Sequence, residues 1–487
     1  MSVIPTSALS GTVLSPIYRE IQTPRLARPI SRFTGLHVHF VGVGGSGMSG
    51  LARMLIDCGA LVTGSDRRGN RQTAELMQMG AQISFEQRGE LLSPTTDLVV
   101  RTAAVKDDHT EMKAADELGL QSIKYAQLLG EVMRERHGVA IAGTHGKSTT
   151  TAMTAFALLK CGLDPSFVVG GIVPQLGGVG SRSGSGEAFV AEACEYDRSF
   201  HNLAPRVAVI TNIEEDHLDC YKDIYEIIES FRKFSHLVPS DGLIIANGRD
   251  ANVAKAVMDT AATIESVSLG DDTIWSTHRR GIVAGCHQGQ VWYRGRPVTT
   301  LRLSVAGEHN LLNATMALAA AHACGADINE AAEALGQFKG VDRRMTAMGS
   351  VNGATVVDDY AHHPTEVRTT LQALRERYAP RRLICVFQPH QHSRTRHLLE
   401  DFATSFSAAD EVVMPDIYFV RDSEEERRSV RAADLVHLIN AGGHNALHIP
   451  SFGDIVAHLR ATVRSGDLVV TMGAGNVNEI ANDLVDL

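Results

Sequence analysis

The stretch GVAIAGTHGKSTTTAMTAFALLKCG spans residues 138–162. An apolar run opens it, a glycine turn follows, and an alanine- and leucine-rich segment continues to Gly162, a residue placed to end a helix. Strand, glycine loop and helix in this order are typical of a parallel α/β sheet. In that context the loop amides and the helix N-terminus can cradle a phosphate group.

The candidate phosphate-binding residues of this loop are Gly143, Thr144, His145, Gly146, Lys147, Ser148 and Thr149. Lys147 is expected to reach the β- and γ-phosphate oxygens of ATP, and Ser148 to hold Mg²⁺. The generic phosphate loop has a glycine six residues before its lysine, where this chain has Ile141, so the loop is a shortened variant. A purely structural turn is the alternative.

A second glycine motif lies in HVHFVGVGGSGMSGLARMLIDCGALVTGSD, residues 37–66. We expect one strand to end at Val43 and a second at Asp66, with a helix between them. The candidate binding residues are Gly42, Gly44, Gly45, Ser46, Gly47 and Asp66. The spacing G-x-G-x-x-G fits a nicotinamide dinucleotide, a plain tight turn or another diphosphate ligand, and the separate ATP loop favours the last.

Length and pattern together predict several α/β domains. Single hydrophobic cores stop growing at roughly 250–300 residues, so a chain of 487 residues should divide into two to four domains. A third series of expected strands begins with TVVDDYAHHP, residues 355–364, and predicts another doubly wound sheet. Residues 289–305 alternate polar and apolar side chains, which predicts a small antiparallel piece in the middle of the chain.

Composition excludes several classes of protein. The net charge of −10 provides no overall positive field, so we expect no binding to nucleic acid. Seven cysteines without a C-x-x-C pair do not form a disulfide framework, which favours a reducing cytoplasm. Residues 1–36 lack the apolar core of a signal peptide and are expected to be a disordered extension. No stretch is long and apolar enough to predict membrane insertion.

Polar residues follow several expected strands, where a ligand crevice forms in a parallel sheet. Glu192 and the pair Asp216 and His217 are candidate Mg²⁺ ligands, although His217 is the less typical one. The alternative is that Asp216 caps the next helix and His217 only packs. Asn310 and Asn313 lie on one helix face and fit either a helix cap or adenine binding.

The motifs, in order, resemble the Mur ligases of peptidoglycan synthesis from about His37 to the C-terminus. They are VGVGGSGMSG (41–50), GTHGKSTTTAM (143–153), VAEACEYDRSF (190–200), TNIEEDHLD (211–219), GEHNLLNA (307–314), DRR (342–344), VDDYAHHPTEV (357–367), FQPH with SRT (387–395) and GAGN (473–476). The resemblance implies three domains: a Rossmann-like domain for the uridine diphosphate sugar over 37–136, a central P-loop ATPase domain over 137–340 and a Rossmann-like domain for the amino acid over 341–487.

The resemblance also implies an activity. The chain would be an ATP-dependent ligase that activates a carboxylate as an acyl phosphate and joins it to an amine. Its cofactors would be ATP and Mg²⁺ and its substrates UDP-N-acetylmuramate and L-alanine. It would act in the cytoplasm as a monomer or homodimer.

Residue roles carried over from the family fall into three groups. The catalytic residues would be Lys147, Glu192 and His217, with Ser148, Glu192 and His217 as metal ligands. The nucleotide would also contact Asn310, Asn313, Asp359 and either Arg343 or Arg344, with Arg344 taken as the nucleotide arginine. The lactyl and alanine groups of the substrates would lie near His363, His390 and Arg394.

Four residues depart from the usual family pattern: Ser148, where the family often has threonine, and Cys194, Tyr196 and Gln391. The last replaces an arginine near the substrate carboxylate. A murein peptide ligase is the nearest alternative within the family. A nicotinamide-dependent dehydrogenase would leave Lys147 unexplained. A nucleotide-sensing protein without catalysis would need its metal ligands broken, whereas Glu192 and His217 are intact.

Overall fold

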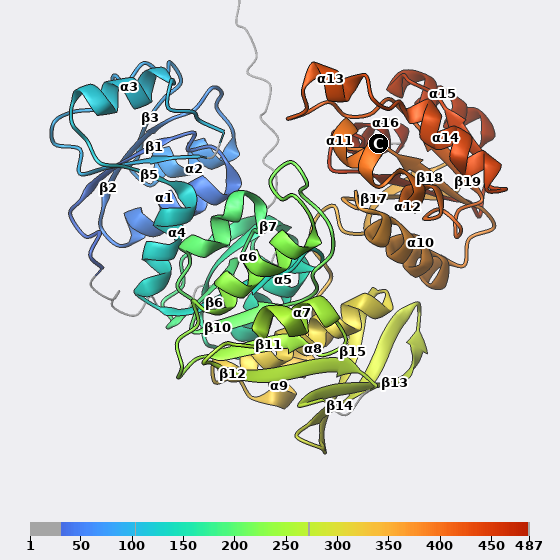
Figure 1. Ribbon diagram of the computed structural model, residues 1–487, viewed down its shortest axis with the longest axis horizontal. Helices are drawn as coiled ribbons and strands as arrows, with labels where there is room; N and C mark the ends of the chain where they lie inside the picture. The colour runs from blue at the N-terminus through green and yellow to red at the C-terminus, as the bar shows by residue number, and fades with distance from the viewer. Residues whose placement is uncertain (1–30, 103, 271–272, 486–487) are drawn as a thin grey trace, which may run out of the picture.

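The computed structural model describes residues 31–102, 104–270 and 273–485. Figure 1 shows three α/β bodies, blue, green to yellow, and orange to red along the chain. Residues 1–30 of the expected extension lie outside the described residues. Residues 31–36 differ from that expectation, because Phe33 is buried in the first core and the Ser31 hydroxyl donates to Glu135 at 2.8 Å.

The first body is a five-stranded parallel sheet in the order β3-β2-β1-β4-β5. Its strands are β1 His37–Val41, β2 Leu61–Ser65, β3 Gln82–Ser84, β4 Leu98–Arg101 and β5 Ser122–Lys124, and its helices are α1 Ser46–Asp57, α2 Arg71–Gln78, α3 Thr110–Glu117 and α4 Tyr125–Arg134. Strand β1 ends at Val41, two residues before the predicted end, because Gly42 adopts a φ of 84° and turns the chain.

The second body is built on a ten-stranded sheet in the order β15-β14-β13-β12-β11-β10-β6-β9-β7-β8. Its strands are β6 His137–Ala142, β7 Ser166–Val173, β8 Val179–Arg182, β9 Ala188–Glu192, β10 Val207–Ile210, β11 Leu243–Asn247, β12 Thr263–Leu269, β13 Trp275–Val283, β14 Cys286–Tyr293 and β15 Arg296–Ala306. Its α-helices are α5 Lys147–Lys160, α6 Ile224–Ser235, α7 Ala251–Val257, α8 Glu308–Ala323 and α9 Ile328–Gln337, and η2 Pro174–Leu176 and η3 Tyr196–Asn202 are 3-10 segments.

Both edges of this sheet are antiparallel. Strands β13, β14 and β15 pair antiparallel, which confirms the piece predicted from the alternation in residues 289–305. The pairing of β7 with β8 at the other edge was not predicted from the sequence.

The third body is a six-stranded sheet in the order β16-β17-β21-β18-β19-β20. Its strands are β16 Thr346–Val351, β17 Ala354–Asp359, β18 Leu383–Phe387, β19 Glu411–Met414, β20 Ala446–His448 and β21 Leu468–Met472. Its helices are α10 Pro364–Tyr378, α11 His392–His397, α12 Leu399–Ala403, α13 Glu424–Arg427, α14 Ala432–Ala441, α15 Phe452–Thr462 and α16 Asn478–Leu484. Only β16 pairs antiparallel among the described strands of this sheet, and it lies at the edge.

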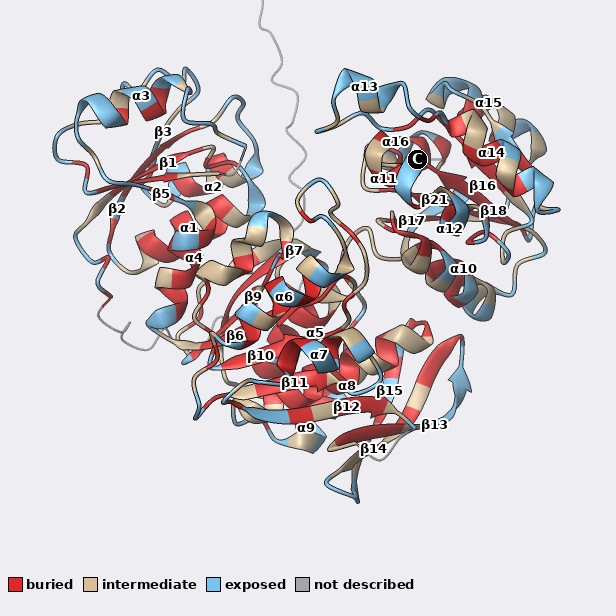
Figure 2. Cartoon of the chain, in the orientation of Figure 1, coloured by how far each residue is buried: buried red, intermediate tan, exposed pale blue. Residues whose placement is uncertain are grey.

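Each core lies between a sheet and its helices, and Figure 2 shows the central strands as almost continuously buried. The parallel strand β6, for example, buries Val139, Ala140 and Ile141 completely, as expected for a strand covered on both faces. Over the described ranges, no helix combines the length and the apolar character that crossing a membrane requires.

Candidate functional site

The phosphate loop connects β6 to α5. Gly143 and Gly146 adopt φ angles of 140° and 80°, in the region that favours glycine. A Cβ on Gly146 would lie 2.8 Å from the side-chain oxygen of Asn313. The two predicted nucleotide-binding segments, this loop and the start of α8, therefore pack against each other.

Lys147 folds back over its own loop. Its Nζ donates to the carbonyl oxygens of Gly143 and Thr144 and lies 3.0 Å from Oε1 of Glu195. Burial alone would lower the pKa of Lys147, but the carboxylate of Glu195 raises it above its usual value. The lysine is therefore held cationic at the start of the helix.

The two predicted oxygen ligands of Mg²⁺ lie side by side. Ser148 Oγ donates to Oε1 of Glu192 at 3.0 Å, and Oε2 of Glu192 accepts the amide of Gly170 at 2.7 Å. They meet because β6 and β9 are neighbouring parallel strands, with Ile141 opposite Glu192. A hydroxyl beside a carboxylate is an oxygen donor set that suits Mg²⁺.

His217, the third predicted metal ligand, lies on the loop that follows β10. Its Nε2 is 3.6 Å from Oε1 of Glu195, the oxygen that also receives Lys147. Buried Nδ1 of His217 and Oε2 of Glu195 have no hydrogen-bond partner among the described residues. Unpaired buried polar atoms beside Lys147 fit a site that a ligand or ion completes.

A cavity of about 230 Å³ adjoins the phosphate loop and collects the predicted nucleotide contacts. Among its lining residues are His145, Gly146, Thr149, Asn310, Asn313, Arg344 and Asp359. Asn313 Nδ2 donates to Asn310 Oδ1 at 3.2 Å, and Asn310 Nδ2 donates to the Ala306 carbonyl at 2.7 Å. The asparagines therefore form a fixed polar wall, and neither caps helix α8, whose N-cap is Gly307.

Asp359 and Arg344 come from the third body. The Asp359 carboxylate accepts the amides of Met345 at 2.7 Å and Ala361 at 2.8 Å, while burial raises its pKa to about 6. The Arg344 guanidinium lies over the ring of Tyr360, 5.2 Å from its centre. This edge of the cavity thus carries the cation of Arg344 and the carboxyl group of Asp359, whose pKa is raised.

Arg394 crosses from the third body to the second. Its Nη2 and Nε lie 2.8 and 3.0 Å from Oδ1 of Asp216, and its Nη1 is 3.2 Å from Nδ1 of His390. Burial alone would raise the pKa of Asp216, but Arg394 and His217 hold it well below its usual range. Asp216 does not cap the following helix, because Asp223 caps α6.

His363, the other predicted substrate residue, lies against the phosphate loop instead. Its ring centre is 4.6 Å from that of His145. Burial alone would lower the pKa of His145, but the nearby carboxylates of Glu214 and Glu366 raise it to about 9.

The first glycine loop is held by side chains of its own domain. The amide of Gly44 donates to Oδ2 of Asp66 at 2.7 Å, and Asn70 donates to the carbonyl of Gly44 at 3.0 Å. Helix α1 begins at Ser46 after Gly45, and no described side chain caps it. Its first amides are therefore available to an anionic group, whereas Asp66 shapes the loop with one of its two oxygens.

The chain matches three domain descriptions of one family. They are "Mur ligase family, catalytic domain" over residues 37–137, "Mur ligase middle domain" over 141–321 and "Mur ligase, glutamate ligase domain" over 343–475. The chain belongs to the Mur ligase family. Membership confirms the predicted three-domain α/β class and makes the protein an ATP-dependent ligase.

Named relatives cover nearly the whole of this Mur ligase. UDP-N-acetylmuramate–L-alanine ligase of Caldanaerobacter subterraneus is 42% identical over 453 residues, 92% of this chain and 97% of its own. The ligase of the same name from Lachnospira eligens is 40% identical over 455 residues, 92% and 98% of the two chains.

Solved structures agree on the fold. The UDP-N-acetylmuramate-alanine ligase of Thermotoga maritima has a TM-score of 0.76 at 26% identity and matches 92% of this chain and 98% of its own. A murein peptide ligase of Psychrobacter arcticus has a TM-score of 0.68 at 28% identity and also matches 92% of this chain and 98% of its own.

Sequence reasoning missed the acidic partners of this Mur ligase site. Glu195 pairs with Lys147, and Glu214 and Glu366 flank His145. Glu195 lies three residues after the predicted ligand Glu192, and Glu214 lies two before Asp216, so both fall inside quoted motifs. Glu366 also lies inside a quoted motif, VDDYAHHPTEV, but no motif indicates that it reaches His145 from another domain.

Proposed function

We propose that this Mur ligase joins L-alanine to the lactyl carboxylate of UDP-N-acetylmuramate, forming ADP and phosphate in peptidoglycan precursor synthesis. The observation that carries the proposal is the 40–42% identity, over 92% of the chain, to ligases named for that reaction. The reaction uses ATP and a nucleotide sugar, and we place it in the cytoplasm.

Amide formation requires an activated carboxylate, because a carboxylate is a poor electrophile and its oxygen a poor leaving group. In the proposed reaction, a lactyl carboxylate oxygen attacks the γ-phosphorus of ATP and the bond to ADP breaks. The neutral amine of alanine then adds to the acyl carbon, loses a proton and expels inorganic phosphate. Positioning and charge stabilisation supply most of the rate, so no nucleophilic serine or cysteine is needed.

Lys147 is proposed to offset the charge of the transferring phosphoryl group. For this it must exchange its contact with Glu195, 3.0 Å away, for the phosphate oxygens. Ser148 and Glu192 would hold one Mg²⁺ and His217 a second, and bound Mg²⁺ would supply Lewis-acid stabilisation of phosphate charge. The unpaired Nδ1 of His217 is consistent with a ligand at that atom.

The substrates are proposed to occupy separate domains. The uridine diphosphate would lie on Gly42, Gly44, Gly45, Ser46, Gly47 and Asp66, where the amides at the start of α1 favour an anion. The nucleotide base and ribose would lie in the cavity beside Asn310, Asn313, Arg344 and Asp359. His390 and Arg394, adjacent to Asp216, are proposed to position the lactyl and alanine groups, with His363 beside the phosphate loop.

A murein peptide ligase is the second candidate, favoured by the structural match to the Psychrobacter enzyme. Phosphate release from ATP plus UDP-N-acetylmuramate separates the two. The purified chain should release phosphate on addition of L-alanine, with glycine and L-serine as matched amino acids. Turnover with the free tripeptide L-alanyl-γ-D-glutamyl-meso-diaminopimelate, and none with any of the three amino acids, would overturn the proposal.

A further inference from the structure

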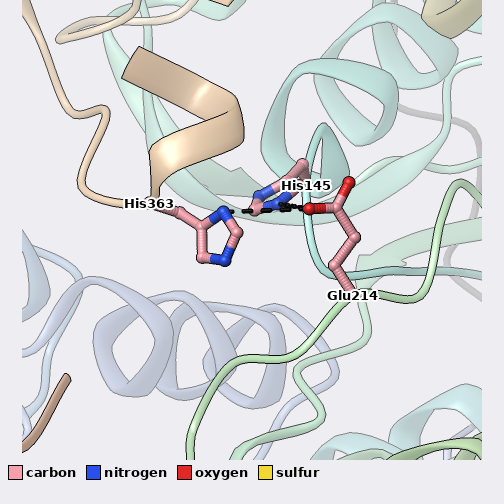
Figure 3. A group of neighbouring side chains, drawn as sticks. All are labelled: His145, Glu214 and His363. Carbon is pink, nitrogen blue, oxygen red and sulfur yellow. Dashed lines mark ion pairs between the residues drawn. The ribbon is translucent and has the colours of Figure 1, made fainter. Parts of the chain in front are cut away.

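Two histidines and one glutamate meet where the second and third bodies touch. Figure 3 shows both rings turned toward the same carboxylate, that of Glu214. His145 belongs to the phosphate loop, Glu214 follows β10, and His363 precedes α10. Nε2 of His145 lies 3.5 Å from Oε2 of Glu214, and Nδ1 of His363 lies 3.9 Å from the same oxygen.

The far nitrogen of each ring is already anchored. Nδ1 of His145 lies 3.2 Å from Oε1 of Glu366, and Nε2 of His363 lies 3.2 Å from the backbone carbonyl oxygen of Glu215. Each anchor accepts a hydrogen bond, so the opposite nitrogen is the one that can act as a ligand. A cation would displace the proton of His145 Nε2, and at His363 Nδ1 it would displace the Thr365 amide. A histidine that donates its second N–H to a carboxylate or carbonyl is the usual arrangement around a protein-bound metal ion.

The two ring nitrogens that face Glu214 make few hydrogen bonds with the rest of the protein. Nε2 of His145 is buried and makes no hydrogen bond with any described residue. Nδ1 of His363 has only the amide of Thr365, at 3.3 Å. Oε2 of Glu214 accepts the Thr365 hydroxyl at 2.6 Å, which fixes the carboxylate in place.

The spacing suits a small tetrahedral ion. Bonds of about 2.0–2.1 Å at a tetrahedral centre separate neighbouring ligand atoms by roughly 3.3 Å. The two distances to Glu214, 3.5 and 3.9 Å, are slightly longer than that value, and all three ligand atoms lie within 4.8 Å of one another. Small side-chain rotations would close the remaining gap.

We propose that His145, Glu214 and His363 form a binding site for a zinc-class divalent cation. Two imidazoles and one carboxylate are a donor set that zinc accepts and that the harder Mg²⁺ disfavours. The site is separate from the proposed magnesium ligands Ser148, Glu192 and His217. Because His363 comes from the third body, the bound cation ties that body to the phosphate loop.

The test is a Zn²⁺ titration of the full chain against a chromophoric chelator, in excess Mg²⁺. One tight equivalent is expected in the wild type. His145→Gln and His363→Gln should each weaken it about 100-fold or more, because even loss of an outer partner costs about 10–100-fold. Glu366→Gln, which replaces the charged anchor of His145 by a neutral amide, should weaken binding less than loss of either histidine.

The controls separate this site from others on the chain. His397→Gln removes a histidine of the third body that contacts Glu215 at 3.3 Å through one carboxylate oxygen, and it should bind Zn²⁺ like the wild type. Glu192→Gln should also leave Zn²⁺ affinity unchanged, because it belongs to the magnesium site. Circular dichroism melting of each variant checks that it is folded.

Spectroscopy of the wild type gives a measurement that does not depend on any variant. Co²⁺ in the tight site should show the strong visible bands of a tetrahedral centre without thiolate charge-transfer bands. Thiolate bands would assign the metal to the seven cysteines and overturn the proposal, as would wild-type Zn²⁺ affinity in folded His145→Gln and His363→Gln.

Discussion

Arg394 of the third domain and Asp216 of the second form a buried ion pair, with Nη2 and Oδ1 2.8 Å apart. The neighbouring residues Glu214 and Glu215 also contact the third domain, through Thr365 at 2.6 Å and His397 at 3.3 Å. The short segment 214–216 is therefore one of the surfaces on which the third domain docks. It lies directly before His217, so docking and the proposed metal site share one loop.

Arg394→Ala should uncouple ATP use from amide formation. Removing one partner of a buried ion pair costs on the order of 3–5 kcal/mol, because the remaining charge stays desolvated. Docking should weaken, and water should then reach the acyl phosphate. Amide formed and phosphate released, measured in the same reaction, should show a ratio below that of the wild type.

Arg396→Ala is the matched control, because Arg396 lies on the same helix α11 and is exposed. It should keep the wild-type ratio. An unchanged ratio with slower turnover in Arg394→Ala would mean that Arg394 only positions substrate.

Ligand binding should close the domains, with hinges near Arg136 and Val341. In small-angle scattering, the enzyme with an ATP analogue and UDP-N-acetylmuramate should have a smaller radius of gyration than the free enzyme.

Lys147→Ala should abolish turnover and leave the protein folded. The side chain binds loop carbonyls and Glu195 rather than packing in a core, whereas its charge is proposed to offset that of the γ-phosphate. Activity should fall more than tenfold, which corresponds to about 1.4 kcal/mol of barrier. Lys160→Ala, at the other end of α5, is the control and should retain activity. A Lys147→Ala enzyme with more than a tenth of wild-type turnover would rule out the role.

Glu192→Gln should raise the Mg²⁺ concentration needed for half-maximal activity. A neutral amide is a poorer ligand than a carboxylate for a hard cation, and its single carbonyl oxygen can accept only one of the two bonds from Ser148 and Gly170. Glu187→Gln, just before β9 and exposed, is the control. Superimposable magnesium titrations of wild type and Glu192→Gln would show that Glu192 is not a ligand.

The sequence predicted the parts of the site whose chemistry is local. The phosphate loop was recognisable because strand, glycines and helix follow one another, and Ser148 meets Glu192 because adjacent parallel strands bring their carboxyl ends together. The edge strand β16 was missed, because a short half-exposed segment carries little apolar pattern. Contacts such as Glu366 with His145 depend on how two domains dock, and no local pattern encodes that.

The three residues predicted to contact the substrates are separated in the structure by the way the domains dock. His363, His390 and Arg394 were placed near one pair of substrate groups from their motifs. In the structure, His390 and Arg394 contact each other, while His363 lies against His145. The carboxyl ends of neighbouring strands identify a crevice, but they do not say which side chain turns toward which partner.

Gly146→Ala should weaken nucleotide binding more than it weakens the fold. Gly146 has a φ of 80°, and an added Cβ would lie 2.8 Å from Asn313 Oδ1. Left-handed backbone costs a non-glycine residue roughly 1–2 kcal/mol. The displaced Asn313 also loses its place in the cavity wall, so affinity for ATP should fall beyond what the loss of stability explains.

Gly162→Ala, just beyond the other end of helix α5, supplies the comparison. Gly162 follows α5 with a φ of 75°, and a Cβ there would meet nothing within 4 Å. It should therefore lose a similar free energy of unfolding, measured by denaturant titration, while its ATP affinity stays at the wild-type value. Equal losses of affinity in the two variants would mean that backbone strain alone is responsible and that the contact between Gly146 and Asn313 does not shape the nucleotide site.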